Sequence, residues 1–256
     1  MTFSLLIQRY GSALAALAAI PDLAARGGRK LSIASLADAK AELAANDDAG
    51  ARLIWRDSDS YPLRLAQFDD APVTLSTRGN LHLLHKPMIA LVGARNASIN
   101  AIRHAETLAR ELGEAGYVIV SGMARGIDAA AHRGAMATGT VGVIAGGIDI
   151  IYPPENRALF QQIVDEGLLL AEMRPGTAPT PRHFPTRNRI IASLALGVVV
   201  IEAAAKSGSL ITAREAGERG SEVMAIPGSP LDPRSNGCNQ LIRDGATLVQ
   251  NAADII

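Results

Sequence analysis

From residue 88 onward the chain repeats one pattern: a short apolar run, a glycine-containing turn and then a helix. The runs do not alternate polar with apolar residues, which is typical of strands covered on both faces. Such strands alternating with helices predict an α/β fold with a doubly wound, mostly parallel sheet. We expect its strands at Met88–Val92, Tyr117–Val120, Thr140–Ala145, Leu168–Ala171, Val198–Glu202 and Glu222–Ile226.

Helical periodicity fills the segments between these strands. In Ala101–Ala115 apolar residues recur every three or four positions, and Gly116 follows as a C-terminal cap. We expect further helices from about Asp128 and at Glu155–Glu166, Asn188–Leu194 and Leu210–Arg219.

The first third of the chain has a different character. Residues 1–50 are rich in alanine and predict a small helical domain, with helices near Ser4–Ile20 and Ile33–Ala45. We expect Pro21 to stop the first of these helices.

Residues 51–85 contain turn formers and two short strand-like runs, Ala51–Trp55 and Val73–Ser76. They predict a connecting extension. The main domain then occupies residues 86–256.

Composition narrows the function classes. Lys and Arg together number 25, as do Asp and Glu, so the chain is no polycation, although a local basic groove stays possible. A single cysteine, Cys238, excludes an intramolecular disulfide framework and fits the reducing cytoplasm. The apolar stretch Ile190–Ile201, which contains no charged residue, has 12 residues, short of the roughly 18–20 that span a bilayer. We expect a cytoplasmic protein with no membrane association.

Small and cationic residues gather where the predicted strands end, which is the edge where sheets of this kind bind ligands. Glycines let the backbone approach a ligand closely, and amides at a helix start attract anions. The pattern predicts a phosphate-binding edge; the alternative is that the glycines only make tight turns. The residues concerned are Gly93, Arg95, Ser121, Gly122, Arg125, Lys206, Ser207, Gly208 and Ser209.

A second signal is a separation of charge. No acidic residue lies between Glu172 and Glu202, whereas four arginines do. Four prolines predict that Arg174–Pro185 is an extended loop, and this loop carries Phe184. Cations beside an aromatic ring suit unpaired nucleic acid, because phosphates need charge and bases need a flat face. The alternative is a core Phe184 beside an ordinary solvated face formed by Arg174, Arg182, Arg187 and Arg189.

Enzyme signatures are missing from the sequence. It contains no GxxxxGK[ST], HExxH or GxSxG motif, and no GxGxxG follows a strand. Asp128 and His132 lie four positions apart and could form an acid–base pair, but such a pair is more often structural. We predict no catalytic residues, no metal site and no cofactor.

Several long motifs resemble the DNA processing protein A (DprA, also called Smf) family. They occur in order across residues 86–256, and residues 1–85 match more weakly. The motifs are Ser121–Asp128 (SGMARGID), Ile151–Asn156 (IYPPEN), Phe184–Ile191 (FPTRNRII), Lys206–Thr212 (KSGSLIT), Ile226–Ser229 (IPGS) and Gly237–Gly245 (GCNQLIRDG).

The resemblance implies a Rossmann-like domain that binds single-stranded DNA, preceded by a small helical domain similar to a sterile alpha motif. Members of this family act in natural transformation: they protect incoming DNA and load the RecA recombinase, generally as homodimers and without catalysis. Many also carry a C-terminal winged helix, and none can be read in this sequence.

The resemblance also assigns site residues. The DNA-binding arginine that follows the first strand's glycine, Gly93, falls on Arg95, and the residues of the second loop fall on Ser121, Gly122 and Arg125. The base-stacking aromatic residue falls on Phe184, followed by the motif's arginines Arg187 and Arg189, and the turn before a later helix is Lys206–Ser209.

Two lysines that are common in the family are replaced by proline, at Pro154 and Pro181, so we expect Arg182 to take over the role of the second and the affinity for DNA to be weaker.

Two alternatives remain. One is a nucleotide-processing Rossmann enzyme of the kind that hydrolyses nucleoside monophosphates. Such enzymes start a helix with PGGxGTxxE, which this chain lacks; Lys206–Ser209 lies at the comparable junction. The other is a structural module for oligomerisation.

Overall fold

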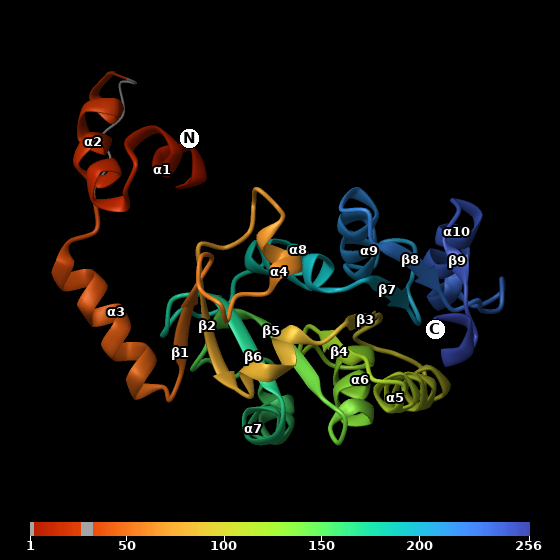
Figure 1. Ribbon diagram of the computed structural model, residues 1–256. Helices are drawn as coiled ribbons and strands as arrows, with labels where there is room; N and C mark the ends of the chain where they lie inside the picture. Colours follow the sequence, from red (N-terminus) through yellow and green to blue (C-terminus); the bar gives the residue numbers. More distant parts are fainter. Residues whose placement is uncertain (1–2, 27–32) are drawn as a thin grey trace.

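The computed structural model describes residues 3–26 and 33–256. In this part of the chain nine strands form one sheet in the order β1-β2-β6-β5-β4-β3-β7-β8-β9 (Figure 1). Neighbours from β6 to β9 are parallel, while β1 and β2 join antiparallel at one edge. The predicted doubly wound, mostly parallel sheet is therefore confirmed.

The predicted strands agree with the observed ones to within two residues at nearly every end. Local apolar runs suffice for this, because the central strands are enclosed by helices and are apolar along nearly their whole length. The strands are β1 (Arg52–Trp55), β2 (Thr74–Gly79), β3 (Met88–Val92), β4 (Val118–Ser121), β5 (Thr140–Gly147), β6 (Leu168–Met173), β7 (Gly197–Val200), β8 (Glu222–Ala225) and β9 (Thr247–Leu248).

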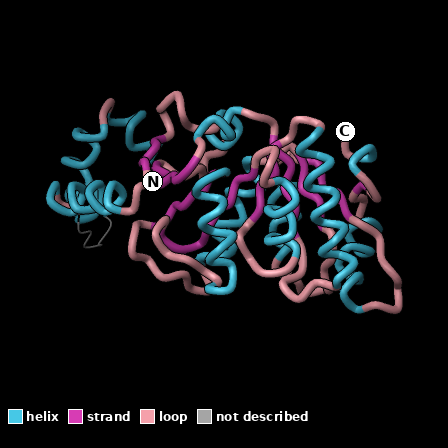
Figure 2. Tube along the Cα trace, turned by 90° about the horizontal axis from the view of Figure 1, so that it is seen from below, coloured by secondary structure: helices cyan, strands magenta, loops and turns pink. Residues whose placement is uncertain are grey.

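Helices cover both faces of the sheet, and Figure 2 shows the face on which α5, α6 and α7 lie. Successive residues of a strand point to opposite faces. In β3, Ile89 and Leu91 pack with α5 and α6, whereas Ala90 and Val92 pack with α8 and α9. The helices are α4 (Leu63–Ala66), α5 (Ile99–Glu114), α6 (Ile127–Ala135), α7 (Arg157–Glu166), α8 (His183–Leu194), α9 (Ser209–Glu218) and α10 (Asn236–Arg243).

The N-terminal helices are set apart from the sheet (Figure 1). In place of one helix at residues 4–20 there are α1 (Phe3–Tyr10) and α2 (Ala13–Arg26), because Gly11 has φ +78° and ends α1. Pro21 lies inside α2, so the prediction that it ends the first helix is wrong; the helix continues to Arg26 despite the lost backbone donor. A third helix, α3 (Leu36–Asp48), starts at a capping box formed by Ser35 and Asp38.

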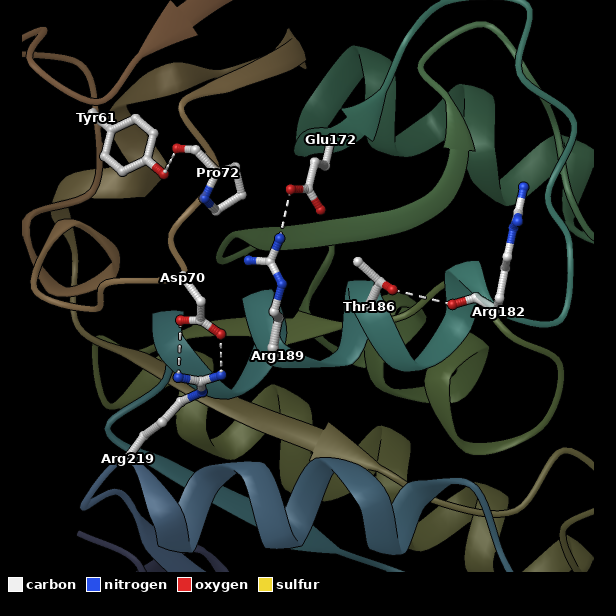
Figure 3. Close-up of polar contacts among 8 residues, drawn as sticks. All are labelled: Tyr61, Asp70, Pro72, Glu172, Arg182, Thr186, Arg189 and Arg219. Carbon is white, nitrogen blue, oxygen red and sulfur yellow. Dashed lines mark hydrogen bonds and ion pairs between the residues drawn. The ribbon is translucent and has the colours of Figure 1, made fainter. Parts of the chain in front are cut away.

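Residues 51–85 belong to the same sheet as the rest, because β1 and β2 lie in this segment and β2 pairs with β6. Polar contacts also tie the segment to the sheet domain. Arg64 donates to the carbonyl of Ala195 (2.9 Å), and Arg219 donates to Asp70 (Figure 3). The domain boundaries at residues 50 and 85 stay predictions.

The extended loop predicted for Arg174–Pro185 is too long. Helix α8 already begins at His183, five residues before the predicted start at Asn188. Pro185 lies in the first turn, where a proline is tolerated because amides there have no helical acceptor. Phe184 therefore occupies the start of a helix.

No helix among the described residues is both long and apolar enough to cross a membrane.

Candidate functional site

Two adjoining cavities lie at the carboxyl edge of the sheet. The larger one, about 870 Å³, is lined by the loop after β3 and the turn before α9, so it opens where the chain leaves β3 and β7 toward opposite faces. We call it the basic groove. The smaller one, about 220 Å³, lies beside the β4–α6 loop, and we call it the side pocket. Both are lined by Arg95, Ala124, Tyr152, Pro179, Phe184 and Arg187.

Arg95 and Phe184 meet on the ridge shared by the two cavities. The guanidinium carbon of Arg95 lies 5.0 Å from the centre of the Phe184 ring, within the range of a cation–π contact. Tyr152 lies on the same ring, with centroids 5.7 Å apart and planes tilted by 52°. The ridge therefore presents two aromatic rings and one exposed cation. The sequence analysis did not select Tyr152 as a site residue, although it belongs to the IYPPEN motif. In the structure this motif lies next to the motif that contains Phe184.

The loop that carries Arg95 is fixed by close backbone packing. A side chain at Gly93 would overlap Ile127 and the carbonyl oxygen of Glu202. The Ala94 amide donates to that same carbonyl at 2.7 Å. Glycine is required at position 93 because the loop after β3 passes directly over the end of β7.

The start of α9 contributes positive potential to the basic groove. Ser207, Gly208 and Ser209 line it together with the exposed Lys206. The first turn of α9 contains no acidic residue, so no carboxylate of this turn neutralises its amides. The groove also includes Arg234, which sequence reasoning missed and which forms an ion pair with Asp232 at 2.8 Å.

Arg187 is the floor of both cavities and is largely enclosed. Only 7% of the residue is exposed, and its Nη1 donates to the carbonyls of Gly122 and Val143, each at 2.5 Å. Burial lowers the pKa of Arg187 to about 10, against the favourable field of Asp128.

Asp128 and His132 face inward from α6. The Ala124 amide donates to Asp128 at 3.3 Å, and burial raises the pKa of this carboxyl group. His132 is fully buried, and its Nδ1 lies 2.7 Å from Thr140 Oγ1, which itself donates to the carbonyl of Ile119. Burial lowers the pKa of His132 to about 3. His132 is neutral and enclosed and lines neither cavity, whereas Asp128 also lines the basic groove.

The structure does not bring three of the predicted residues to these cavities. Ser121 is buried, and its hydroxyl donates to the carbonyl of Leu91 at 2.6 Å. Arg189 forms an ion pair with Glu172 on β6, at 2.5 Å (Figure 3), and lines neither cavity. Arg182 is exposed at the start of α8 but lines neither cavity.

The other predicted residues line at least one cavity, and Arg125 lies at the rim of the side pocket in an exposed ion pair with Glu155, at 3.5 Å. They are Gly93, Arg95, Gly122, Arg125, Phe184, Arg187, Lys206, Ser207, Gly208 and Ser209. Among the residues that the structure describes, no cluster of three or more His, Cys, Asp or Glu side chains could hold a metal ion.

Two family models match the chain. The model for DNA recombination-mediator protein A matches residues 52–256, and the model for the DprA-like N-terminal HHH domain matches residues 1–45. DNA processing protein DprA of Streptococcus pneumoniae is 48% identical over 200 residues, which are 77% of this chain and 71% of that protein. The Bacillus subtilis protein of the same name is 44% identical over 83% of this chain and 73% of its own length.

Solved structures agree with these sequence relatives. The X-ray structure of DprA from Streptococcus pneumoniae superposes with a TM-score of 0.77 at 45% identity, covering 80% of this chain and 73% of that one. DNA processing protein A from Helicobacter pylori superposes with a TM-score of 0.74 at 31% identity, covering 81% and 95%, and is described as binding single-stranded DNA in a unique mode. From its motifs, its sheet and these relatives, the chain belongs to the family of DNA recombination-mediator protein A, the DNA processing protein A family.

Proposed function

We propose that this protein binds single-stranded DNA in the basic groove without strong sequence preference. The observation that carries the proposal is the 5.0 Å contact between the Arg95 guanidinium and the Phe184 ring, on a ridge open to solvent. A cation and an aromatic face at one point are what an unpaired strand needs, because every nucleotide offers both a phosphate and a flat base.

The phosphates would be held by the exposed cations and by the start of α9. Arg95 and Lys206 line the same groove, and the first turn of α9 adds the positive end of a helix dipole. These groups bind any phosphate and carry no sequence information.

The bases would stack on the Phe184 and Tyr152 rings. In the free protein the Arg95 guanidinium covers part of the Phe184 ring. An incoming base therefore either stacks on the guanidinium plane or replaces it when Arg95 moves to a phosphate. Both arrangements are chemically favourable, since bases stack on arginine as well as on aromatic side chains.

The relatives support this reading and extend it. The Helicobacter pylori protein is described as binding single-stranded DNA, and its fold covers 81% of this chain. By analogy with the family, the protein acts in the cytoplasm as a homodimer in natural transformation, protects incoming DNA and loads RecA onto it. The binding itself needs no catalytic group.

Fluorescence anisotropy with labelled oligo-dT tests the proposal. We expect tight, salt-sensitive binding of the single strand, weaker binding of a duplex of the same length, and recovery of intact oligonucleotide. In a parallel assay with nucleoside monophosphates we expect no released base. Absence of oligonucleotide binding would refute the proposal, and released base would favour the nucleotide-processing enzyme instead. A RecA-loading assay on DNA coated with single-strand-binding protein tests the mediator role.

A further inference from the structure

The loop between β4 and α6, residues 122–126, has the composition of a phosphate-binding loop, but side chains of the same chain already occupy its polar groups. Asp128 accepts a hydrogen bond from the Ala124 amide at 3.3 Å, and the nearby Gly122 amide also favours the charged form of this carboxyl group. On the other side of the loop, Arg187 donates to the carbonyl of Gly122. A carboxylate thus lies where a phosphate would otherwise bind.

Arg187 also joins this loop to the neighbouring strand. The same Nη1 that donates to Gly122 donates to the carbonyl of Val143 in β5. Burying a guanidinium is costly unless hydrogen bonds and an opposite charge compensate it. The two carbonyls and the field of Asp128 provide that compensation. Arg187 is therefore committed to internal partners, unlike the exposed Arg95.

The loop of residues 122–126 contains a backbone conformation that is unfavourable for a residue other than glycine. Met123 has φ +57°, a conformation that non-glycine residues rarely adopt. Asn156 supports it from outside, because its Nδ2 donates to the carbonyls of Met123 (2.9 Å) and Ala124 (3.2 Å). Met123, Ala124 and Arg125 form one wall of the side pocket, so the conformation of this loop sets the shape of the pocket.

We propose that Asp128 and Arg187 are positioning residues. The Asp128 carboxylate fills the loop's own anion site, and Arg187 holds the loop from its other side. Together they fix the wall of the side pocket, while DNA phosphates bind elsewhere in the groove. This inference rests on the proposed function, because it concerns the same groove. It replaces the direct DNA contact that the family resemblance suggests for Arg187.

The salt dependence of binding separates a phosphate contact from a positioning role. Each lost phosphate contact lowers the slope of log K against log salt by about 0.7 for a single strand. We therefore compare Arg187→Met with the matched variant Arg95→Ala, using labelled oligo-dT over a range of salt. Arg95→Ala should weaken binding and flatten the slope. Arg187→Met should weaken binding several-fold at an unchanged slope. A flattened slope for Arg187→Met, with unchanged thermal stability, would overturn the proposal.

A double-mutant cycle of melting temperatures tests the proposal even if Arg187→Met folds poorly. A Cβ atom at Gly122 would overlap Nη1, Cζ and Nη2 of Arg187. Gly122→Ala should therefore lower the melting temperature of the wild type, and lower it much less in an Arg187→Ala background, where the space is empty. Equal losses in both backgrounds would show that Arg187 does not hold the loop.

The anion site itself is tested by chemical rescue. Asp128→Ala leaves the loop amides without their carboxylate, so formate should raise the melting temperature of this variant more than that of the wild type. An equal shift in both proteins contradicts an anion site in the loop. These two thermal tests need no DNA. Failure to bind oligo-dT would refute the proposed function, whereas the melting temperatures would still decide whether Asp128 and Arg187 position the loop.

Discussion

The Arg95 guanidinium carbon lies 5.0 Å from the centre of the Phe184 ring, although Arg95 follows β3 and Phe184 lies in the first turn of α8. The two segments meet because parallel strands end at a common edge, and α8 starts at that edge after the chain leaves β6. An exposed contact of this kind contributes only about 0.5–1 kcal/mol. The contact places an exposed cation directly beside an aromatic ring large enough to stack on a base.

Phe184→Ala is expected to weaken binding of oligo-dT while leaving the fold intact, because the half-buried ring sits on the ridge of the two cavities. Loss of one base–aromatic stack costs about 1–3 kcal/mol, or roughly 5- to 150-fold in Kd. Phe184→Tyr is the matched control and should retain most of the affinity. The measurement is anisotropy at one fixed salt concentration. Equal affinities for the alanine and tyrosine variants would exclude stacking on this ring.

Lys206→Ala is expected to weaken the binding of oligo-dT several-fold. It should also reduce the steepness of log K against log salt by about 0.7, as the loss of one phosphate contact should. Lys86→Ala provides the control, since Lys86 is also exposed but precedes β3 and so lies at the opposite edge of the sheet. Its Kd and slope should match those of the wild type. If both lysine variants lose the same affinity, binding depends on overall charge and not on the basic groove.

Arg189→Ala is expected to destabilise the protein by about 1–3 kcal/mol without changing the Kd for oligo-dT. The substitution leaves the partly buried Glu172 without its cationic partner (Figure 3). Urea unfolding measures the loss, and Arg189→Ala combined with Glu172→Gln should lose less than the sum of the two single variants. A raised Kd for oligo-dT at unchanged stability would instead indicate that Arg189 contacts DNA.

His132 is expected to make the protein less stable as the pH falls. Its pKa is about 3 in the folded protein, where burial disfavours the cation, and 6.5 is the ordinary value. Between these values the unfolded chain binds the additional proton, so the free energy of unfolding falls by up to about 1.4 kcal/mol per pH unit below pH 6.5. Above pH 6.5 both states are neutral at this residue and the effect disappears.

His132→Gln isolates this contribution. Urea unfolding at pH 7 and pH 5 should show that the wild type loses about 2 kcal/mol more than the variant over this interval. Other titrating groups, Asp128 among them, are common to both proteins and cancel in the comparison. Parallel losses in the two proteins would mean that His132 is accessible to protons in the folded state.

The helices and strands of the sheet domain follow from short-range patterns, and so does the gathering of cations at one edge. The strand predicted at Tyr117–Val120 is one example: Gly116 and Ser121-Gly122 bound its apolar run in the sequence, and β4 is observed at Val118–Ser121. The start of α8 was not predictable in this way, because the prolines at 179, 181 and 185 favour extended chain locally. Tertiary packing of α8 against β5 and α9 outweighs that preference.

The amino-acid sequence by itself determined the architecture of the sheet domain, the edge that carries the candidate site and the residues available there, because apolar periodicity and turn chemistry act within a few residues. Only the tertiary structure decided what each arginine does. Positions 187 and 189 are about 200° apart around α8, so one guanidinium enters the floor of the groove and the other meets Glu172. The direction of a side chain on a helix depends on where that helix starts and what packs against it, and both are set by contacts between distant parts of the chain.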